Sequence, residues 1–171
     1  MTFDELTTAI GEAVPNAITA TQTETRDPSV TIDAASLLEV MTHLKTDPAL
    51  QFDTLSNLCG VDYFETDPKH VKKFPHESRL EVVYHLFSLT HRHRLTVKVA
   101  LDRDAATPTV PSVAGLWSAA DWHERECFDL FGIRFDGHPN LVRILCPDDW
   151  VGHPLRKDYE QPLEYDGIRG R

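Results

Sequence analysis

Cysteine is scarce in this sequence, and its spacing does not suit a metal cluster. Cys59, Cys127 and Cys146 lie 68 and 19 residues apart, so no CxxC pair occurs. The odd number argues against a disulfide framework and favours a reducing compartment. An iron–sulfur cluster needs four thiolates or a mixture of cysteine and histidine. We therefore expect no cluster held by this chain alone.

Long apolar runs and positive charge are also lacking. No stretch approaches the ~20 apolar residues of a membrane span, and the start, MTFDELTTAIGEAV, has no basic region, so we expect no secretory signal. Lysine and arginine number 17 against 27 acidic residues, a net charge of -10. This charge opposes binding to nucleic acid and to an anionic membrane surface. The chain is expected to meet a membrane only through partner proteins.

Motifs for nucleophilic catalysis and nucleotide binding are missing as well. The sequence has no GxSxG, no GxGxxG and no P-loop, and its eight glycines are spread along the chain. A free-standing hydrolase of these kinds, or a nucleotide-binding domain, therefore has no support from motifs.

The apolar patterning that is present predicts one α+β domain, with helices packed on a mostly antiparallel sheet. A chain of 171 residues is long enough to bury a core of its own. We expect helices at 3–13, 34–46 and 119–131, and strands at 17–25, 29–32, 61–64, 79–89 and 95–101. Leu37, Leu38, Met41 and Leu44 form one apolar stripe, with Asp33 as the N-cap.

Several connections complete this prediction. A helical turn is expected at 54–58, loops at 65–78 and 102–111, and a helix cap at Ser118. After Gly132 the periodicity fades and turn residues recur. We divide the chain into an α+β domain over residues 1–137 and an irregular, extended C-terminal docking segment over residues 138–171.

Glu124 is a carboxylate on the apolar face of the third helix, beside Cys127. Burial there would raise its pKa, which is typical of an acid–base residue. The alternative is a buried ion pair with Arg134, Arg143 or Arg156, because a buried charge needs a partner. We favour the ion pair.

The histidines suggest a metal site that stays incomplete. His91 and His93 share one face of a strand, but no third ligand follows at motif spacing, so a solvated turn is expected. His138 and His153 lie in Gly-His-Pro turns, where we expect them to bond backbone carbonyls.

The segment from Trp122 to Tyr159 resembles the 30 kDa subunit family of respiratory complex I, which in bacteria is the C-type subunit of NADH-quinone oxidoreductase. The residues that carry the resemblance are Glu124-Arg125-Glu126, Asp129, Phe131-Gly132-Ile133, Phe135, Gly137-His138-Pro139, Leu141, Arg143-Ile144-Leu145, Pro147-Asp148-Asp149-Trp150 and Gly152-His153-Pro154-Leu155-Arg156-Lys157-Asp158-Tyr159. Residues 30–160 are similar overall, including the Gly60-Val61-Asp62-Tyr63 stretch.

The resemblance implies a non-catalytic subunit in the peripheral arm of a proton-translocating NADH:quinone oxidoreductase. That complex passes electrons from NADH through FMN and iron–sulfur clusters to a quinone such as ubiquinone. In the family this subunit holds no cofactor, because FMN and the clusters lie in partner subunits. The implied partners are the D-type large quinone-site subunit and the B-type terminal-cluster subunit. The implied location is the cytoplasmic side of the cell inner membrane, as a peripheral protein.

No catalytic, cofactor-binding or metal-binding residue is carried over from the family. We expect structural or partner-interface roles for Glu124, Arg125, Arg143, Trp150, His153, Arg156, Lys157 and Asp158. Deletion of residues 150–171 is expected to leave the domain folded and to prevent co-purification with the large subunit.

Two other functions remain open from the sequence. The motif does not separate complex I from a membrane-bound nickel–iron hydrogenase or a related dehydrogenase that does not use NADH. A free-standing metal-dependent hydrolase would use Glu124 and the histidines, and would purify with stoichiometric metal.

Overall fold

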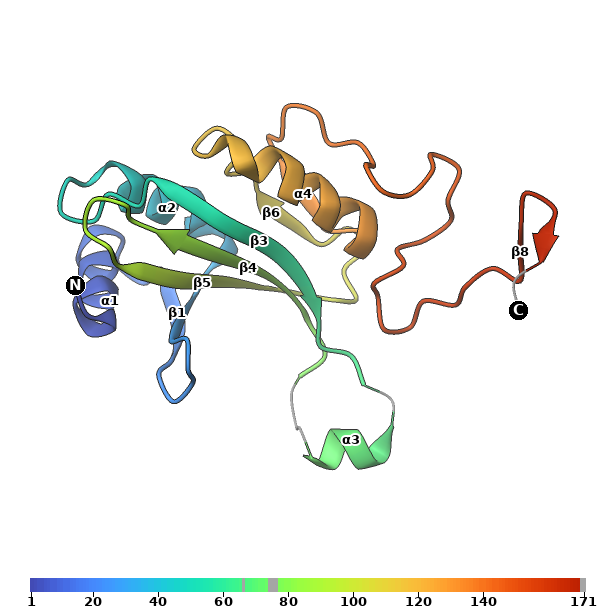
Figure 1. The fold of residues 1–171 in the computed structure, drawn as a ribbon. Coiled ribbons are helices and arrows are strands. Elements are labelled where there is room, and N and C mark those ends of the chain that lie inside the picture. Colours follow the sequence, from blue (N-terminus) through green and yellow to red (C-terminus); the bar gives the residue numbers. More distant parts are fainter. Residues whose placement is uncertain (66, 74–76, 170–171) are drawn as a thin grey trace.

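The centre of the fold is a five-stranded sheet with the order β1-β2-β5-β4-β3 (Figure 1). The computed structural model describes residues 1–65, 67–73 and 77–169. The strands are β1 (Ile18–Gln22), β2 (Ser29–Ile32), β3 (Thr54–Asp62), β4 (Leu80–Phe87) and β5 (Arg94–Leu101). In this sheet β2 and β5 pair in parallel and the other pairs are antiparallel, so the expected mostly antiparallel sheet is confirmed.

The predicted antiparallel hairpin of β4 and β5 is confirmed, and the structure adds its register. Val97 lies opposite Tyr84, and Val99 lies opposite Val82; all four side chains are buried. Strand residues alternate between the two faces, so this register aligns the apolar residues of both strands on the core side.

The predicted helical turn at 54–58 is wrong, because β3 covers those residues. The register between β3 and β4 shifts between Leu55 and Asn57, which is a β-bulge. The extra residue brings Leu55 and Leu58 onto the same buried face. Apolar residues three apart therefore imitated helical spacing.

The helices match the prediction in place, with two corrections. They are α1 (Phe3–Ala13), the 3-10 helix η1 (Ala34–Ser36), α2 (Leu37–Thr46), α3 (Pro68–Lys73) and α4 (Ser118–Phe131). Asp33 caps η1 by accepting from the N–H of Ala35, as expected. Leu38, however, is 45% exposed, and Val40 takes its place in the core. The N-cap of α4 is Trp117, so Ser118 is the first helical residue and not the cap.

Short elements lie in segments that were predicted to be loops. α3 lies within 65–78, and β6 (Thr109–Pro111) pairs in parallel with β7 (Arg134–Asp136). Near the end of the chain, β8 (Glu164–Tyr165) and β9 (Ile168–Arg169) form a hairpin. None of the helices in the described residues has the length and apolar character that crossing a bilayer requires.

α4 packs along the edge strand β3, and the chain that follows β7 extends beyond α4 before the β8–β9 hairpin (Figure 1). Gly60 of β3 allows this approach, because a Cβ atom there would lie 2.6 Å from the Phe131 ring. Cys127 points into the core, as expected. The division at residue 137 into a domain and a docking segment stays a prediction.

Candidate functional site

Asp129 on α4 is the first of three anchors that hold residues 138–159 against the body of the protein. Its buried carboxylate accepts from three successive backbone N–H groups, those of Ile144 (3.1 Å), Leu145 (2.8 Å) and Cys146 (2.9 Å). The other oxygen accepts from Arg143 Nη1 at 3.1 Å. Burial alone would raise the pKa of Asp129, but the N–H donors outweigh it and hold the pKa below its usual value. Asp129 is therefore an ionised anchor.

The second anchor is the C-terminal end of α4, which the following chain caps. The last carbonyls of a helix have no partner within it. Here Asp129 O bonds His153 Nδ1 (2.9 Å), Leu130 O accepts from the N–H of Leu155 (3.0 Å), and Phe131 O accepts from Arg156 Nε (2.7 Å). Residues 153–156, which lie more than twenty positions further along the chain, thus supply the hydrogen-bond partners that the last carbonyls of α4 lack.

Gly132 is required at this end of α4 for two reasons. Its φ of 71° is left-handed, as predicted for a helix stop. A Cβ atom at this position would also lie 2.5 Å from the His153 ring. The same glycine therefore ends the helix and leaves room for the histidine.

We expect Gly132→Ala to lower the free energy of unfolding by about 2–3 kcal/mol, from left-handed strain and a lost hydrogen bond. Urea denaturation measures the change. Gly115→Ala is the matched control, since its Cβ would meet nothing within 4 Å. Equal stability of the two variants would contradict this account of Gly132.

The third anchor is a buried ion pair between β3 and the loop after β5. Arg103 Nε lies 2.8 Å from Asp62 Oδ1, and the Asp62 side chain is 0% exposed. Arg103 also donates to Asp158 at 2.6 Å, and the N–H of Lys157 donates to Asp62 at 2.9 Å. Asp62 raises the pKa of Arg103, and Arg103 lowers the pKa of Asp158. Arg103 and Asp158 are therefore held in their charged forms.

Glu124 is buried as predicted, but the predicted ion pair is wrong. Its carboxylate accepts from the Ser112 hydroxyl at 2.5 Å and from the N–H of Val113 at 2.7 Å. Burial raises the pKa of Glu124 to about 7, although both donors act to lower it. The nearest cationic candidate is His138, whose Nε2 lies 3.9 Å away.

The three arginines proposed as partners of Glu124 have other positions. Arg143 pairs with Asp129, and Arg156 bonds Phe131 O. Arg134 lies on β7 with an exposed side chain. Glu124 therefore joins the loop after β6 to α4 through neutral donors.

The prediction for the Gly-His-Pro histidines is confirmed. His138 Nε2 bonds Asp121 O at 3.1 Å, as His153 does with Asp129 O. The N–H of Asn140 donates to the other ring nitrogen, His138 Nδ1, at 3.0 Å. Both rings fasten turns to α4.

His91 and His93 bond loop carbonyls, at Pro48 O (2.9 Å) and Leu50 O (2.7 Å). The expected solvated turn is wrong for His93, which is buried and contacts the Phe52 ring. Within the described part of the chain, no group of three or more His, Cys, Asp or Glu side chains is placed to hold a metal.

Arg125 and Trp150, two further predicted interface residues, also bind within the chain. Arg125 donates to Val142 O (3.2 Å) and lies over the Trp122 ring at 5.0 Å. The Trp150 ring contacts that of Tyr165, with centroids 5.1 Å apart. An interface role for any of the eight predicted residues stays a prediction.

Sequence reasoning missed Arg103 and the β8–β9 hairpin. The hairpin had a readable signal, since Asp166-Gly167 between Tyr165 and Ile168 is typical of a tight two-residue turn. Arg103 had none, because its partners lie 41 and 55 residues away.

The outer surface of the C-terminal segment is rich in apolar side chains. Of the eleven large exposed hydrophobic residues in the described chain, six lie here: Val142, Leu145, Val151, Leu155, Leu163 and Ile168. Val151 is 85% exposed and Leu163 is 78% exposed. Exposed apolar patches are common on surfaces that bind other proteins.

Known proteins resemble this chain over most of its length. The family model described as "Respiratory-chain NADH dehydrogenase, 30 Kd subunit" matches residues 30–165. The C-type subunit of NADH-quinone oxidoreductase from Roseiflexus sp. (strain RS-1) is 49% identical over 146 residues, which cover 85% of this chain and 77% of that protein. The same subunit from Salinispora arenicola (strain CNS-205) is 42% identical, over 96% of this chain and 65% of that protein.

Two solved structures share the fold. The trypsin-resistant fragment (1-134) of Nqo5 has 30% identity and a TM-score of 0.61, over 81% of this chain and 97% of that one. A chain of the archaeal membrane-bound sulfane sulfur reductase has a TM-score of 0.67 over 92% of this chain and 85% of that one. Its identity of 24% shows likeness of fold alone.

Proposed function

This chain belongs to the family of the 30 kDa subunit of respiratory-chain NADH dehydrogenase, and on that basis we propose that it is a non-catalytic docking subunit in the peripheral arm. The complex is an NADH-quinone oxidoreductase, which is respiratory complex I. In this proposal FMN and the iron–sulfur clusters are held by partner subunits, and this chain stabilises their assembly.

The observation that supports this role best is that polar side chains of the Trp122–Tyr159 segment bond groups within the chain. The carboxylate of Asp129 and the imidazole of His153 bond backbone groups that fix the C-terminal segment to α4. The apolar side chains of that segment, such as Val151 and Leu163, face outward. Polar groups thus hold the segment in place while its apolar groups are left for a partner.

The proposed partners are the large quinone-site subunit and the terminal-cluster subunit of the complex. We place the chain on the cytoplasmic side of the cell inner membrane, where only its partners contact the lipid. The net charge of -10 supports this indirect attachment, because anionic headgroups repel an acidic protein.

The names of the relatives favour NADH as the electron donor over a nickel–iron hydrogenase, since those at 42% and 49% identity are both NADH-quinone oxidoreductase subunits. The free-standing hydrolase loses its main argument, because Glu124 and both Gly-His-Pro histidines bond groups within the chain.

Deletion of residues 150–171 would also remove His153 and Asp158, which hold the segment to the body. A sharper test replaces Val151 and Leu163 by aspartate, because neither is buried in the chain. We expect the double variant to fold normally and its co-purification with the large subunit to fall at least tenfold, since charges at an apolar contact are costly to desolvate.

The matched control carries aspartate at Val71 and Leu89, which are exposed hydrophobic residues outside the C-terminal segment. This control is expected to co-purify like the unaltered chain. Normal co-purification of the Val151/Leu163 variant would show that the segment is not the docking surface.

A further inference from the structure

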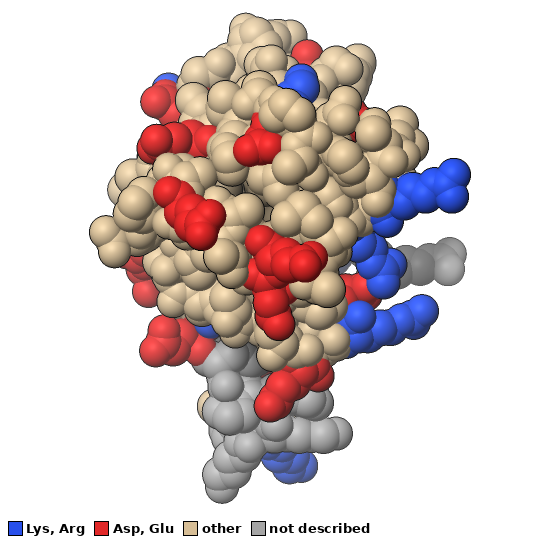
Figure 2. All heavy atoms as spheres, turned by 90° about the vertical axis from the view of Figure 1, so that its left-hand side faces the viewer, with Lys and Arg blue, Asp and Glu red and all other residues tan. Residues whose placement is uncertain are grey.

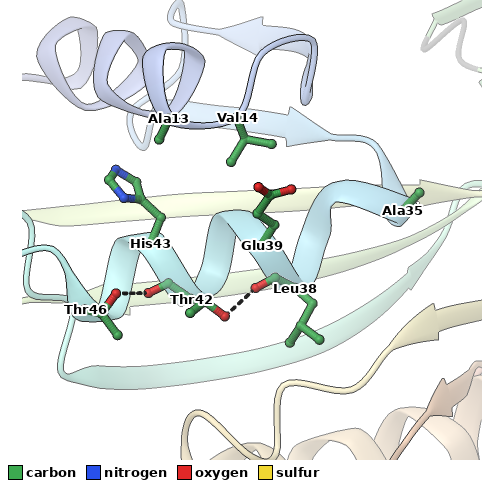
Figure 3. A pocket seen from close by; sticks show the side chains of 8 residues that line it. All are labelled: Ala13, Val14, Ala35, Leu38, Glu39, Thr42, His43 and Thr46. Carbon is green, nitrogen blue, oxygen red and sulfur yellow. Dashed lines mark hydrogen bonds between the residues drawn. The ribbon is translucent and has the colours of Figure 1, made fainter.

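A hollow lies beside the C-terminal end of α1, over the outer face of α2 (Figure 3). Its volume is about 620 Å³, large enough for several side chains. Ala13 at the end of α1 and its C-cap, Val14, line one side, and Glu39 and His43 of α2 point toward them. Leu38 lines the side of the hollow that is turned away from α1. α1 precedes residues 30–165, so one wall of this groove lies outside the region that the family model matches.

The groove combines apolar side chains, such as Val14 and Leu38, with the carboxylate of Glu39 and the imidazole of His43. Leu38 lies at the rim of the groove and is 45% exposed. It is therefore not part of the buried apolar stripe that the sequence predicted. The hydroxyls of Thr42 and Thr46 donate to carbonyls of their own helix, at 2.7 and 2.8 Å (Figure 3). The carboxylate of Glu39 is exposed, and the last turn of α1 has no basic residue to offset its partial negative charge.

The part of the chain that contains both helices of the groove is acidic. Residues 1–53 contain nine acidic residues and two basic ones, which accounts for -7 of the total charge of -10. One of the two bases, Lys45, donates to Leu116 O and lies over the Trp117 ring at 5.6 Å, so its charge is engaged elsewhere. Figure 2 shows the side of the molecule that carries α1, where acidic side chains are spread over the face and most basic ones lie along one edge.

We propose that the α1–α2 groove is a second docking site, which takes a lysine or arginine and an adjacent apolar side chain from a segment of another subunit. The aliphatic stem of the cation covers Leu38, and its N–H groups meet Glu39 and the end of α1. A second copy of this chain is a poor occupant, because two faces of the same negative charge repel. The inference rests on membership in a multi-subunit complex, but not on the surface of residues 138–169.

The test uses a photo-crosslinking amino acid at position 38 in the assembled complex, with the linked peptide identified by mass spectrometry. We expect a peptide of another subunit with Lys or Arg within three residues of the linked position. Glu39→Lys in the same chain is expected to reduce the yield at least tenfold, because it places a cation against a cation. Glu24→Lys, with the same charge change on the β1–β2 loop, is the control and should retain the yield.

A linked peptide without a basic residue, a link to a second copy of this chain, or no link at all would overturn the proposal. So would equal yields from the Glu39 and Glu24 variants. Co-purification of the large subunit with each variant is measured in parallel. Intact assembly with no link at position 38 rejects the groove alone, whereas failure of the Val151/Leu163 test concerns the C-terminal segment.

Discussion

Replacing Arg103 by leucine is expected to lower the free energy of unfolding by about 3–5 kcal/mol, because it leaves the buried Asp62 carboxylate without its cation. The Arg103 side chain is only 6% exposed, so water cannot take over its role without local opening. The change also frees Asp158, one of the contacts that hold the C-terminal segment. Urea denaturation gives the loss, and limited proteolysis is expected to cut near residue 158 sooner.

Arg94→Leu is the matched control for this prediction. It breaks the Arg94–Asp27 pair, in which the two side chains are 75% and 55% exposed. Exposed pairs contribute about 0–1 kcal/mol, so this variant should be nearly as stable as the unaltered chain. Adding Asp62→Asn to Arg103→Leu should recover part of the stability, because the buried charge is then gone. A loss no greater than that of Arg94→Leu would refute the importance of the buried pair.

The parts of the fold that the sequence predicted well are those in which local patterning and tertiary packing agree. The alternation of Leu95, Val97 and Val99 identified β5, because each inward residue meets an inward residue of β4. The spacing of Leu55 and Leu58 led to the wrong prediction of a helical turn, because a bulge in β3 places apolar residues three apart on one face. A bulge cannot be predicted from the local sequence before the partner strand and its register are known.

The candidate site shows the same division between local and distant contacts. The buried position of Glu124 followed from the helical period, and the carbonyl bonds of His138 and His153 followed from their turns. The partner of Glu124 was wrong because the backbone N–H of Val113 satisfies it, and every residue except proline carries that donor. A rule that pairs a buried acid only with basic side chains overlooks such donors.

Glu124 should make the stability of the protein fall as the pH rises from about 5 to 7. Its pKa of about 7 in the folded chain exceeds the ordinary value of 4.5, because burial and the charge of Asp121 oppose ionisation. The folded state therefore keeps a proton that the unfolded state releases, and the free energy of unfolding decreases until the pH passes 7. A difference of this size corresponds to about 3 kcal/mol at most.

Glu124→Gln is expected to remove this slope and to make the protein more stable than the unaltered chain at pH 8. Glutamine keeps an acceptor for the Val113 N–H and cannot ionise, while Ser112 can rotate to accept from the new amide. Chemical denaturation at pH 5, 6, 7 and 8 measures the slope, with Glu126→Gln on the exposed side of α4 as the control. If the Glu124 and Glu126 variants show the same slope as the unaltered chain, Glu124 does not titrate in this range. In that case the Ser112 and Val113 donors would outweigh burial and keep Glu124 ionised, as the N–H donors do for Asp129.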